Sequence, residues 1–410
     1  MSTTAWKRTT LGSVARLRAG STPSRKRLEY FATGSIPWVK TGDLTNGFIL
    51  TTDERVTPQA VDDCSLLINP PDTVLIAMYG GFNQIGRTGL LTMDAATNQA
   101  IMAVRCDPAQ LSPRFLLTVL NARITHWRSV ASSSRKDPNI TRSDIESFPL
   151  PLPSLHKQQQ IATIAEDFEA EQRTIVALVA AKQGLVREVT QQLLTGQRRY
   201  GPFDSQGHTR STPFGDIPPD WDYPEIQSIA HQMSVRAGPD CQSPVLACSK
   251  YDGLVESLSY FGRRIFSADT SNYKVVRRGQ FAFPTNHIEE GSIGLLRDHP
   301  EGLVSPIYVV FEPTDRVVPE FLYAVFKSET YRHIFAAATN SSVNRRGSLR
   351  WAEFGKLRVP LPSTEEQQRI AETLLALTRD VDGLGRLAVL LDKQKRAVLG
   401  RLLSGELELP

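Results

Sequence analysis

The sequence predicts an α+β protein made of two similar globular domains separated by two long antiparallel helices. The helices are expected to form an intramolecular coiled coil, so that the chain is a pseudo-two-fold internal repeat. The first observation is that "PLPSLHKQQQIA" at residues 151–162 returns as "PLPSTEEQQRIA" at residues 360–371, an offset of 209 (360 minus 151). The second is that β-rich runs with Gly and Pro precede each copy of this stretch. The third is the long amphipathic segment without proline that follows each copy.

The repeat extends well beyond these two stretches. With no gap, "LLTG" at residues 193–196 aligns with "LLSG" at residues 402–405. Further upstream the offset becomes slightly smaller, and "GRTGLL" at 86–91 aligns with "GSIGLL" at 291–296. A duplicated unit gives such recurring anchors with a drifting offset after insertions and deletions in its loops. We therefore expect two copies of one unit that perform two similar tasks.

The repeat also sets the domain boundaries that we expect. The connector between the copies is dense in Gly, Pro and Ser and has little capacity to fold alone. The five expected parts are a first globular domain (1–150), a first long helix (151–197), the connector (198–220), a second globular domain (221–358) and a second long helix (359–410).

Both long helices carry apolar residues at the 3-4 spacing that is typical of a coiled-coil seam. Each helix should be roughly 60 Å long, too long for one small domain to bury, so the other helix is the expected partner. The alternative is two separate surface helices, each packed on its own domain. The expected helix-packing and subunit-packing residues are Ile161, Phe168, Ile175, Leu178 and Leu185 in the first helix, and Ile370, Leu377, Leu384, Leu387 and Leu391 in the second.

Composition sets limits on location and partners. A hydrophobic fraction of 40% over 410 residues can bury real cores, and the formal net charge of +4 does not by itself select a nucleic-acid partner. No apolar run is long enough to span a membrane, and the N-terminus lacks the apolar stretch of a signal peptide. The four cysteines form no CxxC pair, so we expect core thiols in a reducing compartment and no structural metal. These features indicate a cytoplasmic protein without a membrane partner.

The order and duplication of these features resemble the specificity subunits of Type I restriction-modification systems. The resemblance rests on the paired "PLPS…QQ.IA" helix starts, the "LL.G" helix ends and "SIPWVKTGDL" at residues 35–44, and it covers essentially the whole chain. It implies two target-recognition domains, each of which reads one half of a bipartite, asymmetric site in double-stranded DNA. It also implies that the helices dock methyltransferase subunits and that restriction subunits join this core.

The same resemblance implies a chain that is not itself an enzyme. It would be the DNA-recognition subunit of a complex that is both a site-specific deoxyribonuclease and an adenine-specific DNA methyltransferase, in defence against foreign DNA. The chain would hold no cofactor, whereas the assembled complex is implied to use S-adenosylmethionine, ATP and Mg²⁺.

DNA binding requires cations for phosphates and forked or amide donors for base edges. Such side chains cluster at corresponding places in the two copies, and this recurrence favours a DNA interface over a solvated surface loop. Tyr251 is equally compatible with a core position. The candidates are a basic loop with a nearby lysine (Arg25, Lys26, Arg27, Lys40), two loops between strands (Asn83, Gln84, Arg87 and Asn286, His287), two basic segments before the helices (Arg135, Lys136, Asn139, Arg142 and Asn344, Arg345, Arg346, Arg350) and a weaker group (Lys250, Tyr251, Arg263, Arg264).

Two motifs resemble catalytic ones and lack their key residue. "GFNQIGRT" at residues 81–88 has arginine where a phosphate-binding P-loop needs lysine. "NPPD" at residues 69–72 has Asp72 where an adenine methyltransferase has an aromatic residue to stack on the flipped base. Two other classes of function stay open: an enzyme, which would need a cofactor or metal signature, and a scaffold whose helices are its working part. Sequence-specific protection of DNA would argue against the scaffold.

Overall fold

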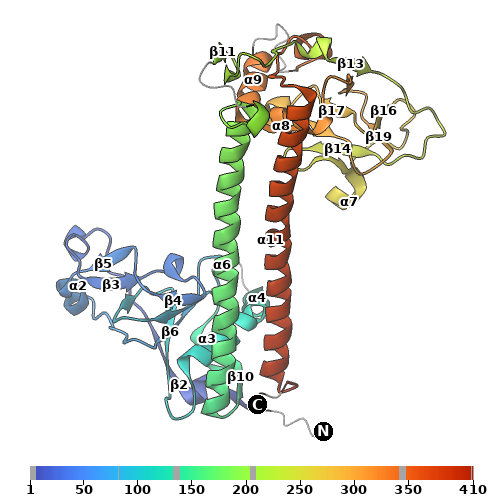
Figure 1. Ribbon diagram of the computed structural model, residues 1–410. Coiled ribbons are helices and arrows are strands. Elements are labelled where there is room, and N and C mark those ends of the chain that lie inside the picture. The colour runs from blue at the N-terminus through green and yellow to red at the C-terminus, as the bar shows by residue number, and fades with distance from the viewer. Residues whose placement is uncertain are drawn as a thin grey trace. The chain divides into compact units, whose positions relative to one another are not determined.

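The computed structural model describes residues 6–81, 83–132, 139–203, 209–340, 348–407 and 409. Contacts divide the chain into two compact units, Met1–Ala177 with Arg386–Pro410, and Leu178–Gly385. Each unit therefore holds one globular part, the start of one long helix and the end of the other (Figure 1). In the described residues, no helix combines the length and hydropathy that a membrane crossing requires.

The first unit is built on a five-stranded sheet of order β2-β9-β6-β7-β4, beside a three-stranded sheet of order β5-β3-β8. The central strand β6 reads VLIA and is buried along its whole length, as expected for a strand covered on both faces. Its strands are β1 (Lys7–Thr10), β2 (Ala15–Ala19), β3 (Ile36–Val39), β4 (Gly47–Ile49), β5 (Glu54–Val56), β6 (Val74–Ala77), β7 (Thr88–Leu91), β8 (Ala96–Thr97), β9 (Ile101–Cys106) and β10 (Pro149–Leu152), and its short helices are α1 (Leu11–Val14), α2 (Pro58–Asp63), α3 (Pro113–Ala122), α4 (Ile124–Ser132) and α5 (Arg142–Glu146).

The second unit has a four-stranded sheet of order β13-β20-β17-β18 and three two-stranded sheets, β11-β12, β14-β15 and β16-β19. Stacked and tilted aromatic rings fill its core, including Phe281 against Phe311 with ring centroids 5.0 Å apart. Its strands are β11 (Arg210–Thr212), β12 (Gly215–Ile217), β13 (Ala230–Met233), β14 (Leu246–Ser249), β15 (Gly253–Glu256), β16 (Lys274–Arg277), β17 (Phe281–Pro284), β18 (Gly294–Leu295), β19 (Glu301–Val304) and β20 (Tyr308–Pro313), and its short helices are α7 (Ser257–Phe261), α8 (Pro319–Lys327), α9 (Glu329–Asn340) and α10 (Trp351–Phe354).

The two sheets share one topology, which confirms the predicted α+β repeat. The order β2-β9-β6-β7 in the first unit matches β13-β20-β17-β18 in the second, and the neighbouring strands are antiparallel in both. The aligned "GRTGLL" and "GSIGLL" stretches contain β7 and β18. In each unit two helices follow the last sheet strand, α3 and α4 in the first and α8 and α9 in the second.

The long helices are α6 (Leu155–Leu194) and α11 (Thr364–Ser404), and both begin and end in the same way. Ser154 and Ser363 precede them, and their hydroxyl oxygens accept hydrogen bonds from backbone N–H groups three residues later, at 3.5 and 3.3 Å. Gly196 and Gly405 follow the helix ends with φ of 70° and 81°, the left-handed conformation that glycine adopts at low cost.

The two long helices pack against each other in antiparallel orientation, which rules out the alternative of two separate surface helices. In the first unit Lys395 Nζ lies 2.9 Å from Glu169 Oε1, and Gln172 Nε2 donates to Asp392 Oδ1 at 3.3 Å. The residue number rises along α6 while it falls along α11, as antiparallel helices require. In the second unit Lys182 Nζ lies 2.9 Å from Asp380 Oδ2, also between the helices.

The helix seam differs from the prediction at three leucines. Leu178, Leu185 and Leu387 are exposed by 43%, 52% and 47%, so the expectation that they pack between the helices of this chain is wrong. The neighbouring residue takes each place in the seam, because an apolar pair such as Leu178-Val179 offers two phases of the 3-4 spacing and the helix geometry allows only one. The observed stripe is Phe168, Gln172, Ile175, Val179, Lys182, Val186 and Val189 on α6, and Ile370, Leu374, Leu377, Val381, Leu384, Ala388 and Leu391 on α11, all buried or half-buried; Ile161 is buried at the start of α6.

The connector is more ordered than its composition suggests. In its described residues, β11 and β12 form an antiparallel hairpin with Arg210 opposite Ile217. Phe214 and Ile217 from this hairpin are buried in the core of the second unit. This part of the connector is ordered by packing on the second unit, because two apolar side chains among the Gly and Pro residues enter its core. The expectation that the connector has little capacity to fold alone stays a prediction.

Candidate nucleic-acid interface

The two loops expected to read bases leave equivalent strands of the two sheets. The first runs from β6 to β7 and the second from β17 to β18. Gly80, Gly81 and Gly86 have positive φ in the first loop, and His287 and Gly291 have positive φ in the second, so the backbone turns sharply in both loops. The first loop is anchored by the buried Ile85, and the second by the buried Ile288 and Ile293.

In each unit, the chain that follows the basic segment is hydrogen-bonded to this loop or its strand end. The Ile140 N–H donates to the Met78 carbonyl at 3.1 Å in the first unit, and the Leu349 N–H donates to the Thr285 carbonyl at 2.7 Å in the second. Ile140 and Leu349 are related by the offset of 209 (349 minus 140). The structure thus brings together, in both units, two regions that the sequence marked separately.

Five of the candidate residues lie outside the described residues: Arg135, Lys136, Asn344, Arg345 and Arg346. Their described neighbours are placed. Asn139 is half-buried, the exposed Arg142 pairs with Glu146 at 2.7 Å, and the exposed Arg350 is the N-cap residue of α10.

The polar residues of the first loop differ in their exposure and in their hydrogen bonds within the chain. Asn83 is exposed, whereas Gln84 is half-buried and accepts a hydrogen bond from the Thr41 hydroxyl at 3.3 Å. Arg87 Nε donates to the Asn83 carbonyl at 2.9 Å, which holds that guanidinium along the loop. Asn83 is therefore the side chain of this loop that is best placed to meet a base edge.

The basic loop near the N-terminus is tied by carboxylates. Arg25 and Lys40 both bind Glu54, at 2.6 and 2.7 Å, and these hydrogen bonds hold the pKa of the Glu54 carboxyl below its usual range. Arg27 pairs with Glu29 at 2.7 Å. Lys26 is exposed, and the described residues give it no polar partner. Phosphate contact by Arg25, Lys40 or Arg27 would therefore compete with an internal ion pair.

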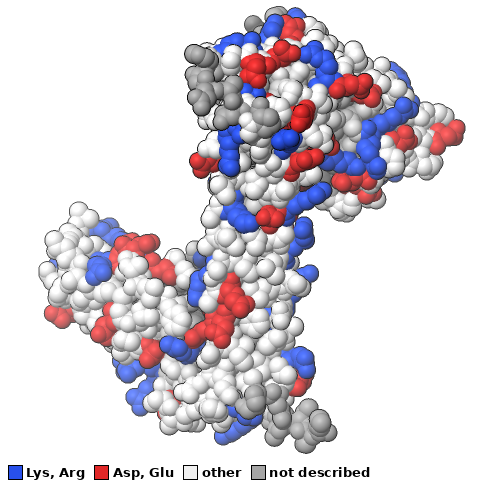
Figure 2. Space-filling model, in the orientation of Figure 1, with Lys and Arg blue, Asp and Glu red and all other residues white. Residues whose placement is uncertain are grey.

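In the second unit, the weaker candidates lie on the surface around α7. Tyr251 is 80% exposed, so it is not a core residue, and the Lys250 ammonium lies 5.5 Å from its ring centroid. Arg263 and Arg264 are exposed, and Arg264 donates to the Ser267 carbonyl at 2.9 Å. Figure 2 shows Lys and Arg side chains gathered over β16 and β19 of this unit, with acidic side chains beside them.

In the loop between β17 and β18, two carboxylates lie beside the predicted Asn286 and His287. His287 and Asn286 are exposed, and the ligand atoms of His287, Glu289 and Glu290 lie within 4.8 Å of one another. His287 Nδ1 is 3.4 Å from Glu290 Oε1. The loop therefore presents carboxylate acceptors as well as the predicted donors, and an acceptor suits the amino group of cytosine.

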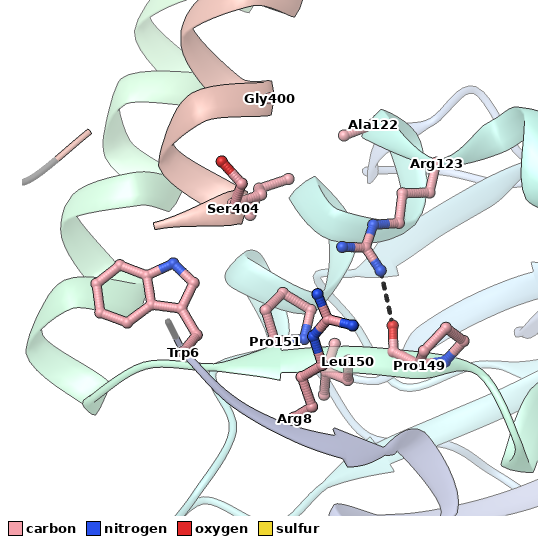
Figure 3. Close-up of a pocket in the computed structure, with 10 residues that line it drawn as sticks. Trp6, Arg8, Ala122, Arg123, Pro149, Leu150, Pro151, Gly400 and Ser404 are labelled. Carbon is pink, nitrogen blue, oxygen red and sulfur yellow. Dashed lines mark hydrogen bonds between the residues drawn. The ribbon is translucent and has the colours of Figure 1, made fainter. Parts of the chain in front are cut away.

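A pocket of about 330 Å³ lies in the first unit at the end of α11 (Figure 3). Arg8 and Arg123 point toward each other there, and Arg123 donates to the Pro149 carbonyl at 2.8 Å. Burial and the nearby charge of Arg8 lower the pKa of Arg123. Cations complement a helix C-terminus, so we interpret the pocket, as far as its described lining goes, as packing at the end of α11.

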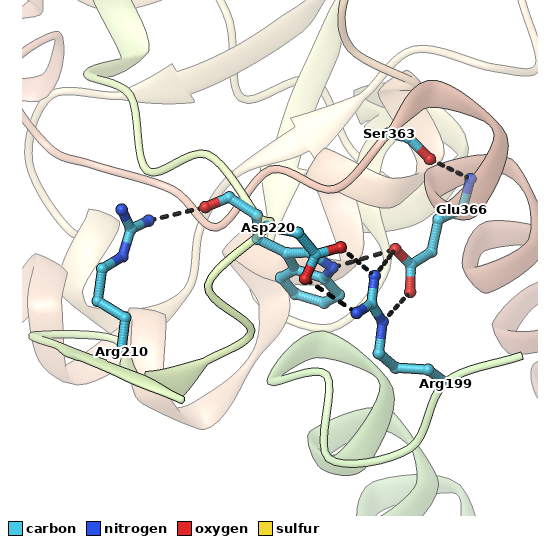
Figure 4. Close-up of polar contacts among 6 residues, drawn as sticks. Arg199, Arg210, Asp220, Ser363 and Glu366 are labelled. Carbon is cyan, nitrogen blue, oxygen red and sulfur yellow. Dashed lines mark hydrogen bonds and ion pairs between the residues drawn. The ribbon is translucent and has the colours of Figure 1, made fainter. Parts of the chain in front are cut away.

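A buried ion-pair network ties the start of α11 to the chain after α6 in the second unit (Figure 4). Arg199 donates to both carboxylate oxygens of Glu366, at 2.7 and 2.8 Å, and to both oxygens of Asp220, at 2.7 and 3.0 Å. The Trp221 indole N–H donates to Glu366 at 3.0 Å. The carboxylates raise the pKa of Arg199 above its already high usual value, so its charge is fixed.

One glutamine at the start of each long helix was missed as a site residue, although the signal was in the repeated "QQ". Gln158 and Gln367 are both 0% exposed and are related by the offset of 209 (367 minus 158). Each side chain is hydrogen-bonded to the backbone of the loop that precedes α3 or α8. These two residues form what we call the helix joints.

The family model described as "Type I restriction modification DNA specificity domain" matches residues 4–178 and 260–390. The Escherichia coli protein "Type I restriction enzyme EcoR124I/EcoR124II specificity subunit" is 24% identical over 186 residues, which cover 45% of this chain and 44% of that protein. The Methanocaldococcus jannaschii "Type I restriction enzyme MjaVIII specificity subunit" is 22% identical, and the match covers 66% of this chain and 64% of that protein. The matched region thus spans less than two thirds of either relative.

Among solved structures, the crystal structure of the Type I restriction-modification system S subunit from M. genitalium superposes with a TM-score of 0.57 at 14% identity. The superposition covers 100% of this chain and 98% of that one. At this identity the likeness concerns the fold, which the two chains share over their whole lengths.

Proposed function

The chain belongs to the Type I restriction-modification DNA specificity family, and from this membership we propose that it selects the DNA site for a restriction and methylation complex. Its two globular parts, residues 1–150 and 221–358, are proposed as target-recognition domains that each read one half of a bipartite, asymmetric site. The observation that carries the proposal is the duplicated arrangement of a strand-to-strand loop beside the end of a basic segment. The chain would catalyse no step itself and would act in the cytoplasm, where the DNA is.

The two half-sites are proposed to differ in sequence because the two loops differ in chemistry. The first loop offers Asn83 beside Gln84 and Arg87, and an amide suits adenine while a guanidinium suits guanine. The second offers Asn286, His287 and two carboxylates. A true homodimer would present the same side chains twice and would read a palindrome.

The test is methylome sequencing of cells that express the chain with its methyltransferase, compared with cells that express the methyltransferase alone. One methylated bipartite motif, with two unlike halves and an unread spacer, should depend on the chain. A chain-dependent motif that is continuous and palindromic, or no chain-dependent motif, would overturn the proposal.

Methyltransferase subunits are proposed to dock on the exposed apolar side chains of the long helices, and restriction subunits to join that core. Exposed apolar side chains in the first unit include Val176, Leu387, Val389 and Leu390. Isolated surface leucines are common, but several on one helical stretch indicate a protein-binding surface. S-adenosylmethionine, ATP and Mg²⁺ are proposed as cofactors of these partner subunits and not of this chain.

A matched pair of variants separates docking from helix packing. Leu387→Asp should leave the unfolding free energy within about 0.5 kcal/mol of wild type, because the side chain already faces solvent. It should nevertheless abolish co-purification with the methyltransferase. Leu391→Asp, four residues away and buried in the seam, should cost about 2 kcal/mol in the free chain. Normal co-purification of Leu387→Asp would remove this face from the proposed docking surface.

The basic segment before α10 should supply phosphate contacts. Arg345→Ala with Arg346→Ala is expected to weaken DNA binding by the assembled complex and to reduce the slope of log K against log salt by about 2, close to one unit for each lost phosphate contact. The preference among DNA sequences should stay the same. An unchanged slope in the folded double variant would place this segment away from the phosphates.

A further inference from the structure

We infer that Gln158 and Gln367 are positioning residues, which hold each recognition domain at a fixed angle on its long helix and thereby limit the half-site spacing that the complex accepts. The inference rests on the proposed function, since it concerns how that function is made selective. The new element is that two buried side chains, and not the helices alone, limit the half-site spacing.

The first helix joint lies entirely within the first unit. Gln158 Nε2 donates to the Gln110 carbonyl at 2.8 Å and to the Pro153 carbonyl at 2.9 Å, and its Oε1 accepts from the Ser112 N–H at 2.8 Å. Ser112 is the N-cap residue of α3, and Gln110 lies in the loop between β9 and α3. One amide group thus connects the helix start to the domain loop by two hydrogen bonds, and a third bond fixes it to Pro153 just before the helix.

The second helix joint repeats the first atom for atom within the second unit. Gln367 Nε2 donates to the Arg316 carbonyl at 3.0 Å and to the Pro362 carbonyl at 2.9 Å, and its Oε1 accepts from the Val318 N–H at 2.8 Å. Val318 is the N-cap residue of α8. The contacted loop residues are Gln110 and Ser112 in one copy and Arg316 and Val318 in the other, so the side chains differ while the bonded backbone atoms correspond.

Hydrogen bonds to main-chain atoms suit a joint that must hold two domains whose base-recognising side chains differ. A primary amide supplies two N–H donors and an oxygen acceptor. In both joints the two donors and the acceptor are all hydrogen-bonded, and the glutamine is 0% exposed. Because the bonds reach only main-chain atoms, the geometry is independent of which side chains a domain carries.

The joints also lie one sheet strand away from the reading loops. The contacted loop follows β9 in the first unit and β20 in the second, and these strands pair directly with β6 and β17, from which the reading loops emerge. A rigid sheet transmits any rotation at the joint to the loop at its other end. A loosened joint therefore changes where a reading loop can reach along the DNA, while the loop's own contacts to bases stay intact.

The test uses the full chain assembled with its methyltransferase and measures methylation of duplexes whose spacer is native, or longer or shorter by one or two base pairs. Gln158→Met and Gln367→Met keep the side-chain size and remove all three hydrogen bonds. Each should lower the preference for the native spacer over a spacer one base pair longer by about tenfold, which corresponds to about 1.4 kcal/mol. The preference for each base within both half-sites should be unchanged. Both variants should weaken the preference for the native spacer length in the same direction.

Gln159→Met and Gln368→Met are the matched controls, because these neighbouring glutamines are exposed, and Gln368 donates to Glu372 on its own helix. Both should keep the wild-type preference for spacer length. If a methionine variant does not fold, Gln158→Glu and Gln367→Glu retain the acceptor and lose the two donors, and they should relax the spacer in the same direction.

Three results would overturn the inference. The first is a folded pair of variants that keeps the wild-type spacer preference. The second is a loss of base preference in the neighbouring half-site at an unchanged spacer preference, which would make the glutamine a local folding residue. In both cases the wild-type complex still methylates a bipartite motif and the proposed function stands. The third is a wild-type complex without such a motif, which removes the proposed function and the inference together.

Discussion

Replacing Glu366 with alanine is expected to destabilise the second unit by about 3–5 kcal/mol, the usual cost of removing one partner from a buried ion pair. The Glu366 and Arg199 side chains are only 1% and 3% exposed. The substitution would leave the Arg199 guanidinium buried with Asp220 as its remaining carboxylate, and the Trp221 indole N–H without its acceptor. Such a loss is a large part of the total stability of an ordinary domain.

The measurement is denaturant unfolding of the full chain, followed by tryptophan fluorescence. Glu365→Gln is the control, because Glu365 is exposed and, among the residues that the structure describes, pairs with Arg369 on the same face of α11. It should change the unfolding free energy by about 0.5 kcal/mol or less. The double variant Arg199→Met with Glu366→Leu should recover most of the loss, since apolar residues can replace a buried ion pair. A single Glu366→Ala variant as stable as Glu365→Gln would show that the network contributes nothing.

Exchange of residues 1–150 for the corresponding domain of a relative is expected to replace one half of the recognised site and leave the other half intact. Each mismatched base pair costs about 1–3 kcal/mol in a specific complex, so two or three mismatches should reduce methylation of the original site by at least about 30-fold. The reciprocal exchange of residues 221–358 should replace the opposite half. Methylome sequencing of cells with each hybrid reads both halves at once.

These hybrids keep Gln158 and Gln367, and in each hybrid the joint at the exchanged domain binds backbone atoms of the incoming domain. The spacer length should therefore be the same in the parent and in both hybrids. A hybrid whose motif changed in both halves would show that the two domains do not read independently.

The α+β repeat and the paired helices could be predicted because a duplicated sequence aligns with itself over long stretches. The phase of the helix seam could not. Leu178-Val179, Leu185-Val186 and Leu387-Ala388 each place two apolar residues side by side, and hydrophobicity alone favours the larger leucine. In the folded chain the smaller residue enters the seam, and the leucine is left outside.

The sequence marked the regions of the candidate interface but did not reveal the ion-pair partners of their side chains, and DNA binding by these regions stays a prediction. The pairing of Arg25 and Lys40 with Glu54 joins residues that lie 29 and 14 positions apart, and no local pattern reveals it. The helix joints were visible as repeated letters, yet a glutamine near a helix start is normally exposed. Only the fold shows that the first glutamine of each "QQ" points inward and the second outward.

The polar contacts of the helix seam do not follow the repeat, and this has a consequence for homotypic association of two chains. Adding 209 to Glu169, Gln172 and Lys182 gives Thr378, Val381 and Leu391. Two copies of α11 paired in the same register would therefore set Lys395 against Thr378, Asp392 against Val381 and Asp380 against Leu391. Lys395 then faces a neutral hydroxyl in place of a carboxylate, and a carboxylate faces an apolar residue in the other two contacts. Although gene duplication made the two helices alike, their polar seam residues have diverged. They favour the pairing of α11 with α6 of the same chain over the pairing of α11 with α11 of a second chain.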